Sequence, residues 1–363
     1  MNSQLRKVLP YVLTPLSYLY GAVAFVRNWL FDHKALPIEE FDVSVISVGN
    51  ISIGGTGKTP HVEYLVGQLC STYKIAVLSR GYKRKTKGFI IANSKSTPDV
   101  IGDEPLQIYR KYSSFVKVAV CENRRKGINE LLRVFPDTQL IILDDAFQHR
   151  YVKPKVNILL TEYNRLFTKD HLLPLGRLRE SPSSAYRADM VIVTKCPADI
   201  RPLDIRITSK SLALMPYQEL FFSRYSYGEL RPVFPDENPY YVDLSSLSYK
   251  DTVVLLTGIA NPGGFIRHFG RYPFKVRVSY FPDHHDFSRD DIKSIENMFE
   301  SSRGERKLII TTEKDAVRLA YNPYFPEALK PFVFYMPISV EMIPGLNNAD
   351  LIFSLKKLLS HND

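Results

Sequence analysis

Cysteine is scarce in this sequence of 363 residues, which contains Cys70, Cys121 and Cys196 and no others. Three widely spaced cysteines provide neither the even number of a disulfide framework nor the paired spacing of a zinc site. The sequence also lacks an internal repeat of fixed period and a low-complexity segment. A disulfide-stapled secreted domain and a zinc module are therefore excluded, and the three thiols fit a structural role in a reducing compartment.

A secretory signal is also missing, although the N-terminus is apolar. Residues 8–31 are rich in apolar and aromatic side chains, but they lack the compact apolar core and the small-residue cleavage site of a signal peptide. Two prolines and Arg27 argue against a membrane-spanning helix, whereas several tyrosines and Trp29 are typical of a membrane interface. We expect residues 1–35 to form a membrane-associating segment whose helix lies in the membrane surface or lines an apolar entrance. A helix simply packed on the protein core is the alternative.

Acidic residues are outnumbered by basic ones, 38 against 48, which gives a net charge of +10. This balance favours a nucleic acid, an anionic membrane surface or a phosphorylated substrate as partner, without choosing among them. Residues 80–87 form a basic cluster that suits any of the three, and a solvated loop is equally consistent with it.

The most informative residues that are present lie at 49–60, where a glycine-rich segment follows the apolar run 43–48. A strand that runs into such a loop wraps backbone N–H groups around the phosphates of a nucleotide. In this role Lys58 reaches the terminal phosphate oxygens and the Thr59 hydroxyl binds Mg²⁺. Ser52 stands where the usual pattern has its first glycine. The predicted nucleotide-binding residues are Ser52, Ile53, Gly54, Gly55, Thr56, Gly57, Lys58 and Thr59.

Apolar, β-branched runs alternate with helical patterns along most of the chain. The first part predicts strands at 43–48, 75–79, 116–120, 140–143, 156–160 and 190–194, with helices at 59–71, 104–112 and 125–135. The second part predicts strands at 253–257, 275–280, 307–311 and 332–336, with helices at 262–269, 288–299, 314–320 and 348–359. We therefore expect an α/β fold: a P-loop domain with a doubly wound, mostly parallel sheet at 36–214, a linker at 215–245, and a smaller α/β domain at 246–363.

Two aspartates, Asp144 and Asp145, end the apolar run 140–143. In a doubly wound sheet the carboxyl ends of the strands carry the site. Together with the nucleotide loop, the pair predicts a Mg²⁺ site in which Asp144 binds the ion directly or through water, and Asp145 is a second ligand or orients the water shell. A strand-end aspartate also serves as an ordinary turn residue.

Two further segments carry residues suited to proton transfer. Asp103, in the sequence Gly-Asp-Glu-Pro, could take the proton of an attacking hydroxyl, although a carboxylate at a helix start is also a simple cap. His284, followed by His285, suits the tuning of a proton transfer better than metal binding, because adjacent histidines point apart on a strand; a plain surface loop is the alternative. The basic residues able to neutralise phosphate charge, each of which could equally be a surface or salt-bridge residue, are Arg80, Arg124, Arg125, Arg177 and Arg179.

Taken in order, these motifs make the chain resemble the tetraacyldisaccharide 4'-kinase family of lipid A biosynthesis. The matching segments are 49–60, 78–82, 102–105, 144–149, 173–180, 281–284 and 312–317. The family also has an apolar N-terminal segment, and its nucleotide loop likewise lacks the first glycine. The resemblance implies an ATP- and Mg²⁺-dependent kinase that phosphorylates the 4'-hydroxyl of a tetraacylated glucosamine disaccharide 1-phosphate, giving lipid IVA.

The resemblance also implies roles for single residues. The catalytic residues it implies are Asp103 as the base, His284 as its partner, and Lys58, Arg124 and Arg179 at the phosphates. The residues it implies at the metal are Thr59, Asp144, Asp145 and Glu104, and the nucleotide-binding set gains Tyr82. Arg177 receives no role.

The implied setting is the cytoplasmic face of the inner membrane of a Gram-negative bacterium. There a monomer, attached peripherally or monotopically, would meet its acylated substrate without a nucleic-acid partner. A P-loop ATPase or GTPase in metal or protein maturation is the alternative, but it leaves Asp103, His284 and the N-terminal segment without a task. A non-catalytic membrane or nucleic-acid binder does not explain Lys58 and Thr59 together with a strand-end pair of carboxylates.

Overall fold

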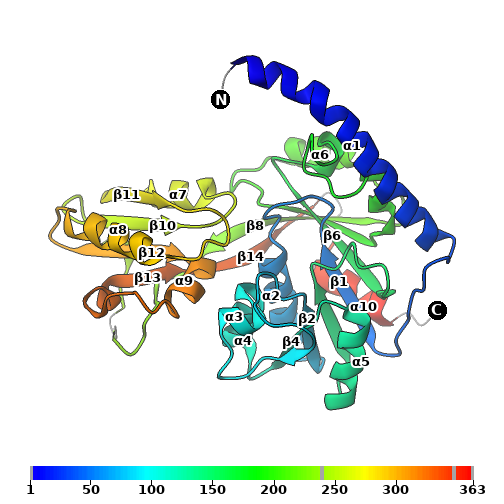
Figure 1. The fold of residues 1–363 in the computed structure, drawn as a ribbon, viewed down its shortest axis with the longest axis horizontal. Helices are drawn as coiled ribbons and strands as arrows, with labels where there is room; N and C mark the ends of the chain where they lie inside the picture. Colours follow the sequence, from blue (N-terminus) through cyan, green and yellow to red (C-terminus); the bar gives the residue numbers. More distant parts are fainter. Residues whose placement is uncertain (1–2, 238–240, 346–348, 361–363) are drawn as a thin grey trace.

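The computed structural model describes residues 3–237, 241–345 and 349–360. They form a larger and a smaller α/β unit, with one long helix lying across the larger unit (Figure 1). The predicted helix start at Asn348, and the parts of the predicted domains at 1–2, 238–240, 346–348 and 361–363, lie outside the described residues.

Within the described residues, a nine-stranded sheet forms the core of the larger unit. Its strands, in spatial order, are β14 (Ile338–Ile343), β8 (Glu219–Tyr227), β7 (Met190–Thr194), β6 (Val156–Glu162), β1 (Ser44–Gly49), β5 (Leu140–Asp144), β2 (Ile75–Ser79), β4 (Val116–Val120) and β3 (Ile90–Ile91). All neighbours pair in parallel except the two edge pairs, β14 with β8 and β3 with β4. The predicted mostly parallel sheet is confirmed.

Helices cover both faces of this sheet. They are α2 (Lys58–Leu69), α4 (Asp103–Tyr112) and α10 (Leu351–Ser360) on one face, and α5 (Arg124–Val134) and α6 (Pro202–Leu212) on the other. Successive side chains of a strand alternate between the faces, so Ile46 and Val48 pack towards α2 whereas Val45 packs towards α5. Burial on both faces explains why these strands read as nearly continuous apolar runs. Shorter helical turns are α3 (Pro98–Ile101) and 3₁₀ turns at Phe167–Lys169, Pro182–Arg187, Leu244–Ser246 and Glu327–Phe332.

The smaller unit contains a five-stranded sheet within the described residues. Its strands, in spatial order, are β11 (Lys275–Tyr280), β10 (Thr252–Thr257), β12 (Lys307–Thr312), β13 (Val333–Met336) and β9 (Arg231–Pro232). The helices beside it are α7 (Gly263–Phe269) on one face, and α8 (Arg289–Glu300) and α9 (Glu313–Leu319) on the other. Leu255 packs towards α7 and Leu256 towards α8 and α9, so this sheet is also buried on both faces.

The structure departs from the predicted layout at three elements. The prediction of a linker at 215–245 is wrong for Glu219–Tyr227, because these residues form β8 inside the large sheet. The later elements β14 and α10 fall within 246–363 yet belong to the larger unit, β14 by pairing with β8 and α10 by packing against β6. In β8 three adjacent residues are buried and the outer ones are not, so the sequence shows no alternation. Where the boundaries between folding units fall stays a prediction.

The chain passes between the two units at neighbouring places. Gly228 follows β8 and Pro337 separates β13 from β14, and the Gly228 N–H donates to the Pro337 carbonyl at 3.0 Å. Away from this crossing, α4 packs against α9. The N-terminal end of α4, which carries Asp103, therefore lies close to the smaller unit.

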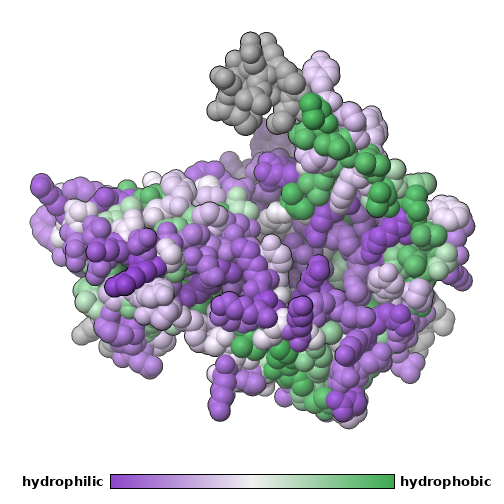
Figure 2. Space-filling model, viewed as in Figure 1, coloured by the Kyte–Doolittle hydropathy of each residue, from purple (hydrophilic) through white to green (hydrophobic). Residues whose placement is uncertain are grey.

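The long helix α1 (Ser3–Asp32) lies on the larger unit and leaves an apolar surface open (Figure 2). Leu19, Val23 and Phe25 are 65%, 65% and 69% exposed. Other positions of the helix are hydrogen-bonded to the larger unit, since Ser17 Oγ donates to the Leu172 carbonyl at 3.1 Å and Arg27 Nη2 donates to the Gln148 carbonyl at 2.7 Å. Among the described residues, no helix combines the length and apolar character needed to cross a membrane.

Candidate active site

The glycine-rich loop joins β1 to α2 and ends in Lys58, the first residue of that helix. Gly54 and Gly57 have φ values of 109° and 91°, which side chains with a Cβ rarely adopt. A Cβ on Gly57 would also collide with the Tyr225 hydroxyl. The loop therefore presents its backbone at the N-terminus of α2, where the unpaired N–H groups and the helix dipole favour an anion.

Hydrogen bonds within the loop, from α2 and from strands β7 and β8 hold this loop in place. Asn50 Nδ2 donates to Thr56 Oγ1 at 2.7 Å, and Thr194 Oγ1 donates to the Thr56 carbonyl at 2.9 Å. His61 Nδ1 contacts the Gly57 carbonyl at 2.7 Å while its Nε2 contacts Ser223 Oγ at 2.9 Å. Burial lowers the pKa of His61 to about 4, so its ring is neutral, and Nδ1 must carry the proton because a carbonyl can only accept.

Asp144 and Asp145 lie at the end of β5, beside the loop, and differ sharply in their surroundings. Asp144 is 1% exposed, and neither of its carboxylate oxygens has a hydrogen-bond partner among the described residues. Burial, reinforced by the charges of Glu104 and Asp145, raises the pKa of Asp144 to about 8. Burial also opposes ionisation of Asp145, but Lys58 at 3.7 Å and Arg179 at 3.2 Å hold the pKa of that carboxyl below its usual range.

Asp103 and His284 come from different units and meet. Asp103 is 3% exposed, and its Oδ2 lies 3.2 Å from His284 Nδ1 and 2.7 Å from Arg318 Nε. Burial opposes ionisation of Asp103, but the hydrogen bonds from His284 and Arg318 and the charge of Arg318 keep its pKa below the usual range. Arg318 Nη1 also donates to the His284 carbonyl at 2.6 Å, so one arginine holds both members of the pair. A cavity of about 380 Å³ opens at this point, lined by Asp103, His284 and Arg318 among others.

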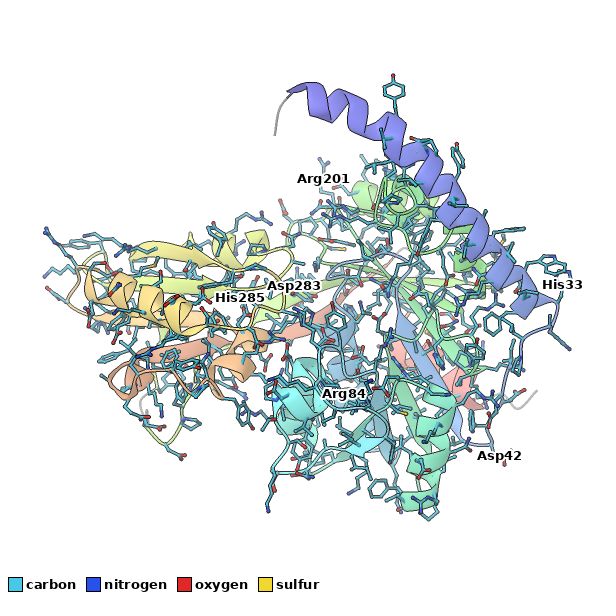
Figure 3. All side chains as sticks on the ribbon, in the orientation of Figure 1. His33, Asp42, Arg84, Arg201, Asp283 and His285 are labelled. Carbon is cyan, nitrogen blue, oxygen red and sulfur yellow. The ribbon has the colours of Figure 1, made fainter. Side chains whose placement is uncertain are left out.

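A second cation, Lys314, links this pair to the carboxylates near the end of β5. Lys314 Nζ lies 2.8 Å from His284 Nε2, 2.9 Å from Asp283 Oδ1 and 3.9 Å from Glu104 Oε1. Glu104 in turn acts on Asp144 through its charge. Figure 3 shows Asp283 and His285 on the side of the smaller unit that faces the larger one. The Asp103–His284 pair and the strand-end aspartates therefore belong to one continuous site.

Several of these residues have strained backbones. Lys83, Asp145, Lys195 and His284 have φ values of 59°, 49°, 56° and 56°, in the left-handed region that favours glycine. Lys83 Nζ donates to the His284 carbonyl at 2.9 Å, and Lys195 Nζ hydrogen-bonds the Gly55 carbonyl. Backbone strain of this kind persists where the surrounding structure enforces it, which is typical of functional sites.

The structure places the remaining predicted residues in different ways. Arg179 lies beside the loop, where its Nη2 contacts Asn50 Oδ1 and Asp145. Arg124 is 2% exposed and donates to the carbonyls of Cys121, Glu122 and Asp144, so its guanidinium clamps the end of β5. Tyr82 packs its ring on that of His284, with centroids 4.9 Å apart. The predicted phosphate contact of Arg124 and the nucleotide contact of Tyr82 stay predictions.

Sequence reasoning missed Arg318, Lys314 and His61 as site residues. Arg318 and Lys314 lie on α9, one turn apart, and so project from the same face of a helix whose sequence shows only ordinary helical charge. His61 lies four residues after Gly57, the spacing at which a helical side chain reaches back to the start of the helix. The adjacent His285 contacts Asp291 at 2.9 Å, so the two histidines have different partners. The predicted reason was wrong, because both lie in the loop that follows β11 and not on a strand.

The donor set of the site fits Mg²⁺. The two unpartnered, buried oxygens of Asp144 are the kind of hard ligand that this ion prefers, and Thr59 stands at the second position of α2. No group of three or more His, Cys, Asp and Glu side chains in the described part of the chain is arranged to hold a metal by itself. In phosphoryl-transfer sites Mg²⁺ takes one or two carboxylates and completes its shell with substrate phosphates and water.

Comparison with known proteins agrees with this geometry. The chain matches the family model for tetraacyldisaccharide-1-P 4'-kinase over residues 9–358. It is 50% identical over 338 residues to the tetraacyldisaccharide 4'-kinase of Bacteroides thetaiotaomicron, covering 91% of this chain and 88% of the relative. The corresponding protein of Flavobacterium johnsoniae is 41% identical over 343 residues, covering 94% and 95%. The crystal structure of LpxK from Aquifex aeolicus in complex with ATP superposes with a TM-score of 0.72 at 30% identity, covering 97% of this chain and 98% of that one.

The fold and the site thus define a P-loop kinase: a phosphate-binding loop, a strand-end pair of aspartates, and a carboxylate–histidine pair opposite. Because the family model spans nearly the whole chain, the class can be narrowed further. The chain belongs to the tetraacyldisaccharide-1-P 4'-kinase family. The relatives reported above are kinases, so the alternative of a P-loop ATPase or GTPase in metal or protein maturation is not supported.

Proposed function

We propose that this chain transfers the γ-phosphate of ATP to the 4'-hydroxyl of a tetraacyldisaccharide 1-phosphate, giving lipid IVA. The observation that carries the proposal is the Asp103–His284 contact, 3.2 Å long, on the same site as a phosphate-binding loop. An acceptor hydroxyl loses its proton as it attacks the phosphoryl group, and the pair supplies a carboxylate that can take this proton.

In the proposed mechanism, the loop and Lys58 hold the phosphates, and Asp103 removes the proton of the attacking hydroxyl. Both partners of Asp103 contact Oδ2, which leaves Oδ1 to accept that proton. The low pKa of Asp103 keeps it ionised at neutral pH, and His284 and Arg318 fix its orientation. Arg179 lies beside the loop, where its charge can stabilise the phosphoryl group in transfer.

Thr59, Asp144 and Asp145 are the residues that would hold Mg²⁺, with Glu104 next to them. Held by these residues, Mg²⁺ would supply positive charge that offsets the negative charge developing in phosphoryl transfer. A cation there also removes the cost of burying Asp144 without a partner.

The acceptor is acylated, and the exposed apolar face of α1 provides a surface for it and for the membrane. The proposal includes peripheral attachment at the cytoplasmic face of the inner membrane, action as a monomer, and no nucleic-acid partner. The net positive charge of the chain suits both an anionic membrane and a phosphorylated acceptor.

The direct test incubates the purified chain with γ-labelled ATP, Mg²⁺ and the tetraacyldisaccharide 1-phosphate, and separates lipid from nucleotide. Label is expected in the lipid with the wild-type chain, and not with Asp103→Ala or without Mg²⁺. Release of labelled phosphate at a rate independent of the acceptor would instead indicate a hydrolase, and failure to bind ATP would revive a non-catalytic binder.

A further inference from the structure

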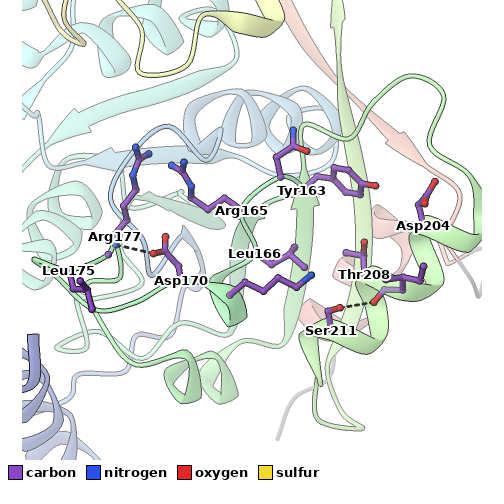
Figure 4. Close-up of a pocket in the computed structure, with 13 residues that line it drawn as sticks. Tyr163, Arg165, Leu166, Asp170, Leu175, Arg177, Asp204, Thr208 and Ser211 are labelled. Carbon is purple, nitrogen blue, oxygen red and sulfur yellow. Dashed lines mark hydrogen bonds between the residues drawn. The ribbon is translucent and has the colours of Figure 1, made fainter. Parts of the chain in front are cut away.

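A second cavity, of about 660 Å³, lies outside the site described above. Figure 4 shows it between the segment 163–177 and helix α6. The charged residues that line it are Arg165, Lys169, Asp170, Arg177 and Asp204. Its volume is in the range of pockets that hold small ligands.

The charges around this cavity are unbalanced. Arg165, Lys169 and Arg177 have no ion-pair partner among the described residues. The carboxylates, in contrast, are already engaged: Asp170 Oδ1 accepts from the N–H groups of His171 at 2.8 Å and Arg177 at 3.3 Å, and Asp204 is paired with Arg201 at 2.9 Å. Three free cations facing two occupied carboxylates make the cavity attractive to an anion.

The position of the cavity indicates which class of anionic ligand it could bind. One end touches the nucleotide loop, since Arg177 Nη1 lies 3.8 Å from the place a Cβ would take on Gly54, and the Ile53 N–H donates to the Arg177 carbonyl at 2.8 Å. The other end is joined to α1, since the Leu175 N–H donates to Ser17 Oγ at 3.0 Å. The cavity thus lies between the phosphate-binding loop and the helix with the exposed apolar face.

We infer that this cavity binds a phosphate ester carried by a lipid. Two arginines offer planar forks that match phosphate oxygens, and Lys169 adds a point charge; in Figure 4 the guanidinium groups of Arg165 and Arg177 are directed the same way. Two sources share this chemistry: the headgroup of an anionic phospholipid, and the 1-phosphate of the acceptor. The second source rests on the proposed function and the first does not.

The test uses the full chain with Arg165→Gln and Lys169→Gln combined, leaving Arg177 intact because its side chain lies beside Gly54 of the nucleotide loop. The matched control combines Arg206→Gln and Lys210→Gln, which removes two exposed cations from α6 outside the cavity. Binding is measured by cosedimentation with phosphatidylcholine vesicles that contain or lack phosphatidylglycerol. The KM values for acceptor and ATP are measured in neutral-detergent micelles free of phospholipid.

If the headgroup is the ligand, the cavity variant loses roughly 25-fold in affinity for the phosphatidylglycerol vesicles, roughly fivefold per cation, while the control changes less than about twofold. If the acceptor is the ligand, its KM in micelles rises by a similar factor. Either result supports the inference. An equal loss in the control pair, no change in either quantity, or a rise confined to the KM for ATP would overturn it. The vesicle result does not depend on phosphoryl transfer, so it stands apart from failure of the proposed function.

Discussion

Asp103 is the residue at which the two units meet within the site. Its carboxylate touches a histidine and an arginine of the smaller unit, while its own helix belongs to the larger one. The arginine does more than neutralise charge, because it also binds the carbonyl of His284. Arg318 is therefore best described as a positioning residue.

Replacing Arg318 by glutamine should shift the acid limb of the activity. Arg318 favours the ionised form of Asp103, so its loss raises the pKa of that carboxyl, and activity is then lost at a higher pH on acidification. The loosened pair also lowers kcat at neutral pH by ten- to a hundredfold, while ATP affinity stays unchanged. The measurement is kcat against pH.

Arg289→Gln is the control, because Arg289 is an exposed arginine of the smaller unit with no ion pair among the described residues. An unshifted acid limb in Arg318→Gln, or a loss of ATP affinity equal to the loss of kcat, would contradict the role given to Arg318.

Among single residues, the sequence predicted site positions for Lys58, Asp103, Asp144 and His284, whose types and motifs are distinctive, and their functional roles stay predictions. It could not identify Arg318, because the partner of Asp103 lies 215 positions away and is fixed by the packing of α9 on α4. It also could not show that Arg124 is buried against backbone carbonyls. An arginine at the start of a helix has the same sequence pattern whether its side chain is buried or exposed to solvent.

At the scale of elements, a buried ionic cluster joins the three helices that carry the site. Lys111 of α4 contacts Glu63 of α2 at 2.6 Å and Glu313 of α9 at 2.7 Å, and Gln107 Nε2 donates to Glu63 at 2.8 Å. Burial raises the pKa of Glu63 to about 7, opposed by the charge of Lys111 and reinforced by that of Glu313. These helices begin at or next to Lys58, Asp103 and Lys314. By holding the three helices together, the cluster therefore fixes the relative positions of these site residues.

Lys111→Met should destabilise the chain by about 3–5 kcal/mol, because it leaves two buried carboxylates without their shared cation. The free energy of unfolding in urea measures this. Lys126→Met, which removes an exposed lysine of α5, is the control and should change little. Adding Glu63→Gln to Lys111→Met should recover part of the loss. Equal stabilities of the Lys111 and Lys126 variants would contradict a structural role for the cluster.

Helices and strands with a clear hydrophobic pattern could be predicted from the sequence. Elements that lack such a pattern could not. The buried parallel strands were recognisable because every residue faces a core, as in β2, β5 and β7. The strand β8 was missed because it lies between the edge strand and the core of the sheet and is buried only in its middle. The return of β14 to the larger unit depends on its pairing with β8. The residues of β14 themselves carry no sequence pattern that predicts this pairing.

For the whole molecule, the exposed face of α1 predicts attachment to a membrane surface. Phe25→Glu should weaken cosedimentation with phospholipid vesicles by roughly ten- to a hundredfold, because a large apolar side chain no longer enters the interface. Turnover of vesicle-embedded acceptor should fall with it, whereas ATP affinity and thermal stability stay the same.

Phe115→Glu makes a fair control, since Phe115 is 64% exposed on a loop between α4 and β4, away from α1. Unchanged vesicle binding in Phe25→Glu, or the same loss in both variants, would show that α1 is not the attachment surface.

The central claim is that Asp103 and His284, from different units, act together to remove the proton of the acceptor hydroxyl, while the loop holds ATP. The decisive measurement is the single-turnover rate of phosphoryl transfer, together with the Kd for ATP, in Asp103→Asn, His284→Ala and the double variant. The account predicts a loss of about 10²- to 10⁴-fold for Asp103→Asn, a smaller loss for His284→Ala, no further loss in the double variant, and Kd values within about twofold of wild type. Additive losses, or a Kd that rises as much as the rate falls, would contradict it.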